Sequence, residues 1–182
     1  MYLIAGTDEV GRGCLAGPVV AAAVILKKRI DNLKDSKALS PKIRSELAKK
    51  ILDNSYYGFG LVSNQKIDEI NILNASLLAM KRAILNLPIK PTLVLVDGIH
   101  KPDLEISMRA IIGGDSSEDA ISAASIIAKV FRDDLMIKYE KKYPGYDFQS
   151  NKGYGTKYHL QALKDFGSCP IHRKTFKGVP TT

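Results

Sequence analysis

The sequence is poor in cysteine and has no long apolar run. Cys14 and Cys169 are the only cysteines in 182 residues, too few and too far apart for a disulfide framework or a zinc site. No stretch approaches the roughly 18 apolar residues that a membrane-spanning helix needs. Residues 1–5 (MYLIA) lack the basic start and the long apolar stretch of a signal peptide. The sequence therefore predicts a cytoplasmic protein with reduced cysteines and no membrane contact.

Acidic residues are scarce compared with basic ones, and the net charge is +8. Residues 27–50 carry nine Lys and Arg against three acids, and residues 120–182 carry eleven against five. Residues 51–119 carry six against nine. Two basic blocks around an acidic middle favour a polyanionic partner such as nucleic acid, although solvated basic surfaces explain them equally well. The length predicts a single domain over residues 1–182.

The order of apolar patterns predicts an α/β fold with a mixed sheet. Strands are expected at residues 2–7, 19–26, 56–62, 92–96 and 106–112. One helix is expected to begin at Ser40-Pro41, with an apolar face at Ile43, Leu47, Ile51 and Leu52. Others are expected at residues 67–87, from a Ser116-Ser117-Glu118-Asp119 capping box to about residue 142, and at about residues 157–166.

The most informative stretch is Asp8-Glu9-Val10-Gly11-Arg12-Gly13, at the end of the first apolar run. Two adjacent carboxylates can hold a divalent cation, and the glycines let backbone N–H groups come close to a polar substrate. Successive residues of a regular strand point to opposite faces. We therefore expect the chain to leave strand geometry near Glu9, so that both acids reach one side.

Asp97 and Asp115 also follow predicted strands, so they share a structural position with Asp8 and Glu9. Neighbouring strands would bring the four carboxylates together, and ligands with only oxygen donors suit Mg²⁺ or Mn²⁺. Two such ions can activate a water molecule and stabilise the leaving oxygen in phosphodiester hydrolysis. Taken alone, Asp97 is also compatible with a turn and Asp115 with a helix cap.

Eight short motifs occur in an order that resembles the type 2 ribonucleases H, the ribonuclease HII of bacteria. The matches run from about residue 4 to residue 176: residues 8–13 (DEVGRG), 16–20 (AGPVV), 35–37 (DSK), 68–73 (DEINIL), 96–98 (VDG), 114–115 (GD), 122–130 (SAASI and AKV) and 152–156 (KGYGT). No single motif is decisive, but the ordered set is specific. Two departures are Cys14, where many members have proline, and Ala38, where a second lysine is common.

The resemblance implies a ribonuclease H-like fold, a mixed five-stranded sheet flanked by helices, with a C-terminal helical segment in the same domain. It implies Asp8, Glu9, Asp97 and Asp115 as the catalytic carboxylates that bind Mg²⁺ or Mn²⁺. It also implies hydrolysis of RNA in RNA–DNA hybrids, and incision of duplex DNA on the 5′ side of an embedded ribonucleotide to leave 5′-phosphomonoesters. We expect a monomer, and the sequence identifies no protein partner.

The resemblance also suggests which residues bind the substrate. Gly11-Arg12-Gly13 can present backbone groups to the 2′-hydroxyl, the one group that distinguishes a ribonucleotide from its DNA neighbours. By family analogy, Tyr154 packs on the sugar of the adjoining deoxynucleotide, where an extra hydroxyl would clash. Lys37 and Arg44 are candidate phosphate contacts on charge grounds.

Ser122, Ser125 and Lys129 lie at i, i+3 and i+7, so they share one face of a predicted helix. This face either contacts the phosphate backbone or uses small residues for close packing on the sheet, and the two explanations have equal weight. His100, His159 and His172 are too dispersed in sequence to suggest a metal site, and each is expected to be structural or on the surface.

Three other functions account for less of the sequence. A dinucleotide-binding enzyme needs G-x-G-x-x-G opening a helix, whereas here the third glycine, Gly17, comes one position late. A binding module without catalysis leaves the acids at strand ends unexplained, because they repel phosphate unless a cation intervenes. A Holliday-junction resolvase would share the clustered acids, but the glycine turn together with Tyr154 favours recognition of ribose.

Overall fold

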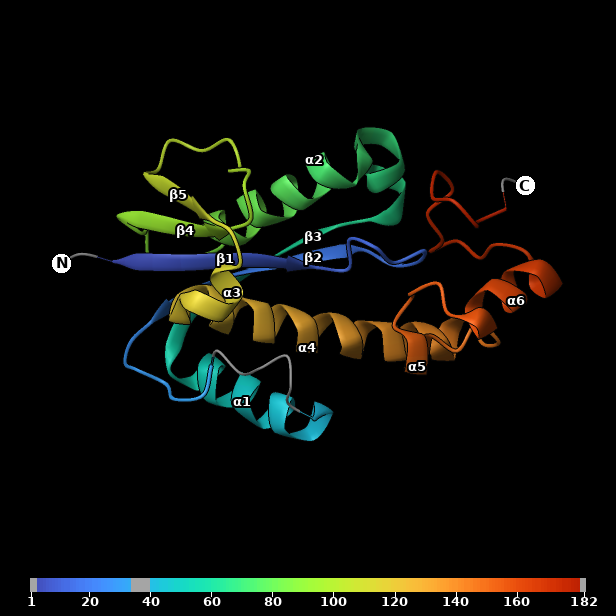
Figure 1. Cartoon of the computed structure of the whole chain (residues 1–182), viewed down its shortest axis with the longest axis horizontal. Coiled ribbons are helices and arrows are strands. Elements are labelled where there is room, and N and C mark those ends of the chain that lie inside the picture. The colour runs from blue at the N-terminus through green and yellow to red at the C-terminus, as the bar shows by residue number, and fades with distance from the viewer. Residues whose placement is uncertain (1–2, 34–39, 181–182) are drawn as a thin grey trace.

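The computed structural model describes residues 3–33 and 40–180, and a mixed sheet runs through this part of the chain. Its five strands are β1 (Ile4–Val10), β2 (Val19–Leu26), β3 (Ser55–Val62), β4 (Leu93–Asp97) and β5 (Met108–Ile111). They lie in the order β3-β2-β1-β4-β5 (Figure 1). β3, β2 and β1 are antiparallel, whereas β1, β4 and β5 are parallel. The mixed five-stranded sheet that the sequence predicts is therefore confirmed.

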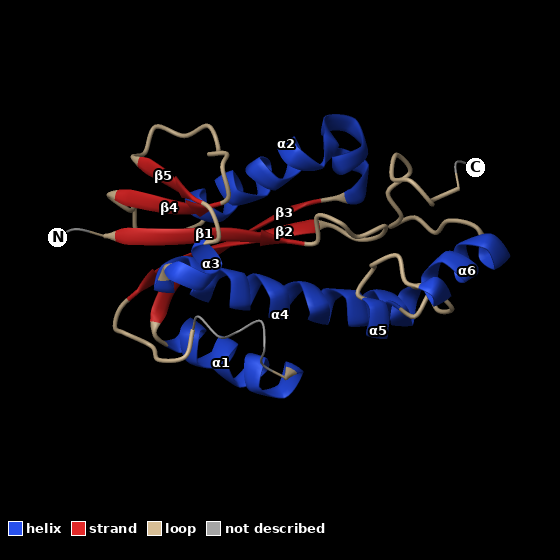
Figure 2. Ribbon diagram, in the orientation of Figure 1, coloured by secondary structure: helices blue, strands red, loops and turns tan. Residues whose placement is uncertain are grey.

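Helices cover both faces of this sheet (Figure 2). The helices of the described residues are α1 (Pro41–Asp53), α2 (Asn64–Leu85), α3 (Gly114–Ser117), α4 (Asp119–Lys142), α5 (Phe148–Asn151) and α6 (Lys157–Phe166). α2 packs on one face, and α4 with α1 on the other. None of these helices is both long and apolar enough to cross a membrane.

Small side chains on β2 allow helices to pack closely on both faces of the sheet. Ala21 and Ala23 are buried with residues of α2, whereas Ala22 and Val24 are buried with residues of α1 and α4. This alternation follows from the two-residue period of a strand. It explains why the segment is apolar throughout, as is usual for a strand covered on both sides.

The start of α4 lies directly against β1 at Gly6. A Cβ atom on Gly6 would lie 2.2 Å from backbone atoms of Ala120 and Ile121, so only glycine permits this approach. Gly6 is two residues before Asp8 in β1. The close approach therefore brings the first turns of α4 beside the acidic end of that strand.

A third apolar cluster lies beyond the end of the sheet. It joins the segment after β1 to α5, α6 and the C-terminal segment, with Leu15, Ala16, Met136, Tyr146, Phe148, Ala162, Leu163, Ile171 and Val179 buried together. Backbone hydrogen bonds run from Leu15 N to Gly153 O at 2.7 Å and from Gly17 N to Ile171 O at 2.9 Å. The glycine-rich segment is therefore held by parts of the chain about 140 residues or more away.

Two helices agree closely with the sequence prediction. Ser40 caps α1 by accepting a hydrogen bond from Ile43 N at 3.4 Å, and α6 occupies the predicted residues and ends at Gly167. The predicted apolar face of α1 is correct for Leu47, Ile51 and Leu52. It is wrong for Ile43, which is 50% exposed.

Two predicted helix features are wrong. The proposed capping box does not form, because Ser116 and Ser117 lie in the separate turn α3 and the N-cap of α4 is Glu118, without a side-chain cap bond. The helix expected at residues 67–87 begins earlier, at Asn64, and is broken at Asn71, where φ is 64°. The Asn71 side chain accepts a hydrogen bond from Asn74 N at 3.1 Å and so caps the helix after the break.

Candidate active site

Asp8 and Glu9 lie inside β1 rather than beyond its end. β1 continues to Val10, and Asp8 pairs with Ala22 and Glu9 with Ala21 of β2. The expectation that the chain leaves strand geometry near Glu9 is therefore wrong. Because β1 is regular here, the two carboxylates leave it on opposite faces.

The end of β4 explains how these two acids still approach a common place. The pairing of β1 with β4 extends to Thr7 and Val96, and β4 ends at Asp97. Beyond that point, within the part of the chain that the structure describes, β1 pairs only with β2, so its other edge is open. The negative charge of Asp97, at this open edge, raises the pKa of both Asp8 and Glu9.

Burial is the largest influence on Asp8, whose exposed fraction is 6%. It raises the pKa of Asp8 to about 8, and the charges of Glu9 and Asp97 add to this rise. The Ser125 hydroxyl and the Glu9 backbone N–H, which donates to Asp8 Oδ1 at 2.7 Å, act in the opposite direction. Asp8 is thus a buried carboxyl group whose ionised form needs a positive charge nearby.

Glu9 has such a charge beside it. Burial raises the pKa of Glu9, but the Arg12 guanidinium opposes the rise through an ion pair of 3.0 Å between Nη1 and Oε1. Arg12 itself is exposed. One residue of the glycine turn therefore contacts the acidic group directly.

The turn after β5 brings Asp115 to Asp97. Asp97 Oδ1 accepts a hydrogen bond from Asp115 N at 3.4 Å, and a Cβ on Gly114 would lie 3.4 Å from the same oxygen. The Ser122 hydroxyl of α4 donates to the carbonyl oxygen of Asp115. The short helix α3 is thus fixed between the end of β4 and the start of α4.

The donor atoms of this acidic group fit a hard divalent cation. Carboxylates supply only oxygen, which Mg²⁺ and Mn²⁺ prefer, and a cation would offset the repulsion that raises the pKa of Asp8. Within residues 3–33 and 40–180, however, no three His, Cys, Asp or Glu side chains are placed so that together they could hold a metal ion. The acids are therefore neighbours in pairs rather than a preassembled ligand shell.

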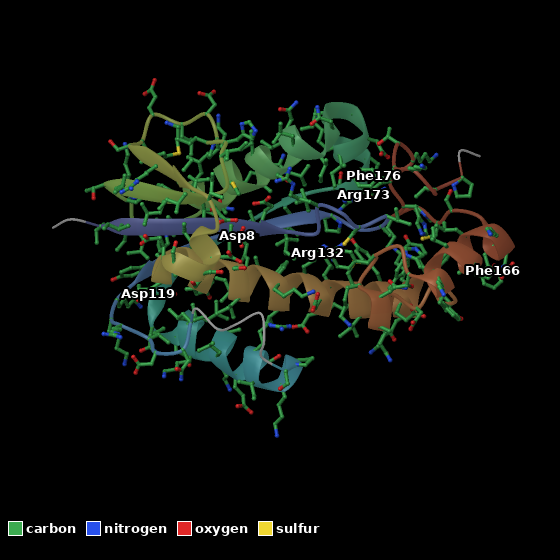
Figure 3. The ribbon with its side chains drawn as sticks, in the orientation of Figure 1. Asp8, Asp119, Arg132, Phe166, Arg173 and Phe176 are labelled. Atoms are coloured by element: carbon green, nitrogen blue, oxygen red, sulfur yellow. The ribbon has the colours of Figure 1, made fainter. Side chains whose placement is uncertain are left out.

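The glycine turn next to these acids rests on two buried arginines. Gly11 has φ +94°, and a Cβ there would lie 2.2 Å from Arg132 Nε. Arg132 and Arg173 are fully buried. Figure 3 shows Arg132 near α4 and Arg173 near the C-terminal segment, with the segment after β1 between them. These two members of the second basic block are therefore inside the protein and cannot bind a polyanion at the surface.

Tyr154 lies on a loop that is bonded to the glycine-rich segment. Its side chain is 41% exposed, and its carbonyl oxygen is 2.8 Å from His159 Nδ1. Burial, followed by the neighbouring Cys14 side chain, which is negative when ionised to the thiolate, raises the pKa of Tyr154. The ring is thus accessible from solvent while its backbone is held on the inner side.

The remaining predicted substrate contacts lie in different environments. Ser122 is fully buried and uses its hydroxyl inside the protein, whereas Ser125 lies beside Asp8. Lys129 pairs with Asp133 at 2.9 Å, and its Nζ is 6.0 Å from the centre of the Tyr154 ring. Arg44 is half-buried on α1, and Lys37 lies outside the described residues.

The histidines form a structural pair that the sequence did not reveal. His159 and His172 are buried, with their Nε2 atoms 2.9 Å apart, whereas His100 is exposed. Burial lowers the pKa of both, that of His172 to about 4. Cys169 N donates to His172 Nδ1 at 2.9 Å. If both rings are neutral, hydrogen bonds can run without interruption from Cys169 through His172 and His159 to Tyr154.

Sequence reasoning missed the two buried arginines, although the helical spacing of Arg132 could have revealed that residue. Arg132 continues the spacing of Ser122, Ser125 and Lys129 along α4, so helical periodicity places it on the face that packs toward β1. Arg173 lies outside the helices, and the carbonyl oxygens that accept hydrogen bonds from its guanidinium belong to residues more than 150 positions away in sequence. No local pattern identifies it.

Comparison with known proteins gives matches over nearly the whole chain. The family model described as Ribonuclease HII matches residues 5–179. The Ribonuclease HII of Pelagibacter ubique is 54% identical over 182 residues, which cover 98% of each chain. That of Pediococcus pentosaceus is 53% identical over 181 residues, covering 98% of this chain and 71% of the relative. The crystal structure of the ribonuclease H2 from Pyrococcus horikoshii OT3 is similar at a TM-score of 0.83 and 31% identity, covering 97% of this chain and 95% of the other.

Proposed function

The chain belongs to the ribonuclease HII family, and from this membership we propose that it cuts RNA–DNA hybrids and duplex DNA that contains single ribonucleotides. Membership makes it an endoribonuclease of the ribonuclease H type with a ribonuclease H-like fold. The finer proposal is that it incises on the 5′ side of the embedded ribonucleotide and leaves a 5′-phosphomonoester. Residues 1–182 would act as one catalytic domain.

Asp8, Glu9, Asp97 and Asp115 are the proposed metal-binding catalytic residues. Bound Mg²⁺ or Mn²⁺ would activate the attacking water and stabilise the leaving oxygen at this end of the sheet. The carboxylates would hold the ions and orient them, with Asp8 held on one side by α4. The influence of Asp97 on both acids of β1 supports this assignment, because neighbouring carboxylates repel one another unless a cation lies between them.

Gly11, Arg12, Gly13 and Tyr154 are the proposed ribose-recognition residues. The turn begins two residues after Glu9, so a nucleotide whose phosphate reaches the acids lies within reach of its backbone N–H groups. Tyr154 would pack on the sugar of the next nucleotide and exclude a hydroxyl there. The observation that carries this proposal is the Leu15 N to Gly153 O bond of 2.7 Å, because it joins the segment that follows the glycine turn to the Tyr154 loop.

Matched duplexes test the proposed function directly. Pure protein would be incubated with Mg²⁺ or Mn²⁺ and three substrates of one sequence: an all-DNA duplex, the same duplex with one ribonucleotide, and an RNA–DNA hybrid. We expect cutting of the second and third only, with the break 5′ of the ribonucleotide in the second. Equal cutting of all three would contradict ribose recognition, and no cutting with either metal would contradict the assigned chemistry.

A further inference from the structure

Two fully buried guanidinium groups hold the segment after β1 from opposite sides. Arg173 donates to Gly11 O at 2.6 Å, Arg12 O at 2.8 Å and Gly17 O at 3.1 Å. Arg132 donates to the carbonyl oxygens of Ala16 at 3.0 Å, Pro18 at 3.0 Å and Lys152 at 2.7 Å. Each guanidinium thus satisfies its buried donors with backbone carbonyls.

The orientation of these carbonyls determines which way the turn's N–H groups point. In a planar trans peptide the C=O of one residue points away from the N–H of the next. Because Gly11 O and Arg12 O point inward to Arg173, the N–H groups of Arg12 and Gly13 point outward. Within the described residues neither N–H has a hydrogen-bond partner. The arginine therefore makes the outer surface of the turn a donor surface.

Arg132 adds a second constraint, because its three bonds reach two different segments. Ala16 and Pro18 follow the glycine turn, whereas Lys152 is two residues before Tyr154. One rigid planar group therefore determines the spacing between the turn and the tyrosine loop. Arg173 is itself held in place, because Asp68 of α2 accepts from Lys174 N at 2.9 Å and Thr175 N at 3.0 Å.

We propose that Arg132 and Arg173 are positioning residues for ribose recognition. Arg173 turns the carbonyls of the glycine turn inward so that its N–H groups meet the ribose, and Arg132 fixes the distance from that turn to Tyr154. This role rests on the proposed function. It explains why two cations are buried among the backbone carbonyls of the segment after β1, since a purely structural need is usually met by apolar packing at lower cost.

Arg132→Lys and Arg173→Lys test the proposal, because lysine keeps the charge and loses the planar fork. A misplacement of about 1 Å costs on the order of 10²-fold in rate. For Arg173→Lys we expect a loss of that order in kcat, with a smaller change in KM, on both ribose-containing substrates. For Arg132→Lys we expect a roughly ten-fold fall in the ratio of single-ribonucleotide to hybrid cutting, because a hybrid lacks the junction that Tyr154 reads.

Ile51→Val is the matched control, since Ile51 of α1 is buried against residues of β2 and α4 and is not among the residues that accept hydrogen bonds from either arginine. We expect Ile51→Val to lower the free energy of unfolding and to leave kcat and the ratio of single-ribonucleotide to hybrid cutting unchanged. The losses in the arginine variants then come from misplaced residues and not from lower stability. If Arg132→Lys keeps the parental ratio, or Arg173→Lys keeps the parental kcat, the proposal is wrong.

A measurement on the unaltered protein covers the case in which both variants fail to fold. Hydrogen exchange at the two guanidinium Nε–H groups, followed by NMR, is expected to be far slower than at an exposed arginine such as Arg12. Exchange as fast as that of Arg12 would overturn the proposal. If the unaltered protein cuts all three duplexes equally while exchange is slow, the proposed function is wrong, although the two guanidinium groups still hold the segment after β1.

Discussion

Gly11→Ala is the sharpest test of how the glycine turn is built. At φ +94° a non-glycine residue is strained by about 1–2 kcal/mol. The new Cβ would also lie 2.2 Å from Arg132 Nε and 2.8 Å from Cδ and Cζ, which is too close to keep the guanidinium in place. Moving it leaves buried carbonyls without donors, at about 1–3 kcal/mol each. We therefore expect a total loss of at least about 3 kcal/mol in the free energy of unfolding.

The assay is urea unfolding near neutral pH, with Gly13→Ala as the matched control. A Cβ on Gly13 meets no atom within 4 Å, and its φ is not in the left-handed region. We expect Gly13→Ala to change the unfolding free energy by less than about 0.5 kcal/mol, as is usual for a substitution at an open surface site. A loss for Gly11→Ala no larger than that for Gly13→Ala would refute this account of the turn and its contact with Arg132.

Three further predictions concern the acids, the histidine pair and the tyrosine. Asp8→Asn should abolish cutting while substrate binding persists. In EDTA, the parental protein should lose stability as pH rises from 3.8 towards about 8, because Asp8 ionises over this range in the unfolded chain but not when it is buried. Asp8→Asn should remove this loss. A flat parental profile there would contradict the burial argument. Because the pKa of His172 is lowered from 6.5 to about 4, its contribution to stability is fully present above pH 6.5. It should be lost as pH falls to about 4, by at most about 1.4 kcal/mol per pH unit, and His172→Gln should show a smaller loss in urea titrations at each pH. Tyr154→Phe should keep the preference for a single ribonucleotide and Tyr154→Ala should lose it, as measured by relative kcat/KM on the junction duplex and the hybrid; equal values for the two variants would rule out ring packing on the sugar.

The candidate site shows which expectations depended only on local sequence. Asp115 follows β5 as predicted, whereas Asp97 is the last residue of β4 rather than the first residue after it. Both strand ends were nevertheless close to their predicted places, because short apolar runs followed by glycine are local signals. The path of the chain at Asp8 and Glu9 was not predicted. β2 pairs with β1 up to Val10, and this long-range pairing outweighs the conformational freedom of the glycines that follow.

Local sequence determined most of the secondary structure, including the Ser40 cap of α1 and the end of α6 at Gly167, because such caps are satisfied within a few residues. It also pointed to the four acids and the glycine turn, whose catalytic and binding roles stay predictions. Only the tertiary structure decided that Arg173 would reach Gly11, a separation of 162 residues, and that Arg132 would be buried. A buried cation is stable only where distant backbone carbonyls converge on it, and the sequence near each arginine contains no record of that convergence.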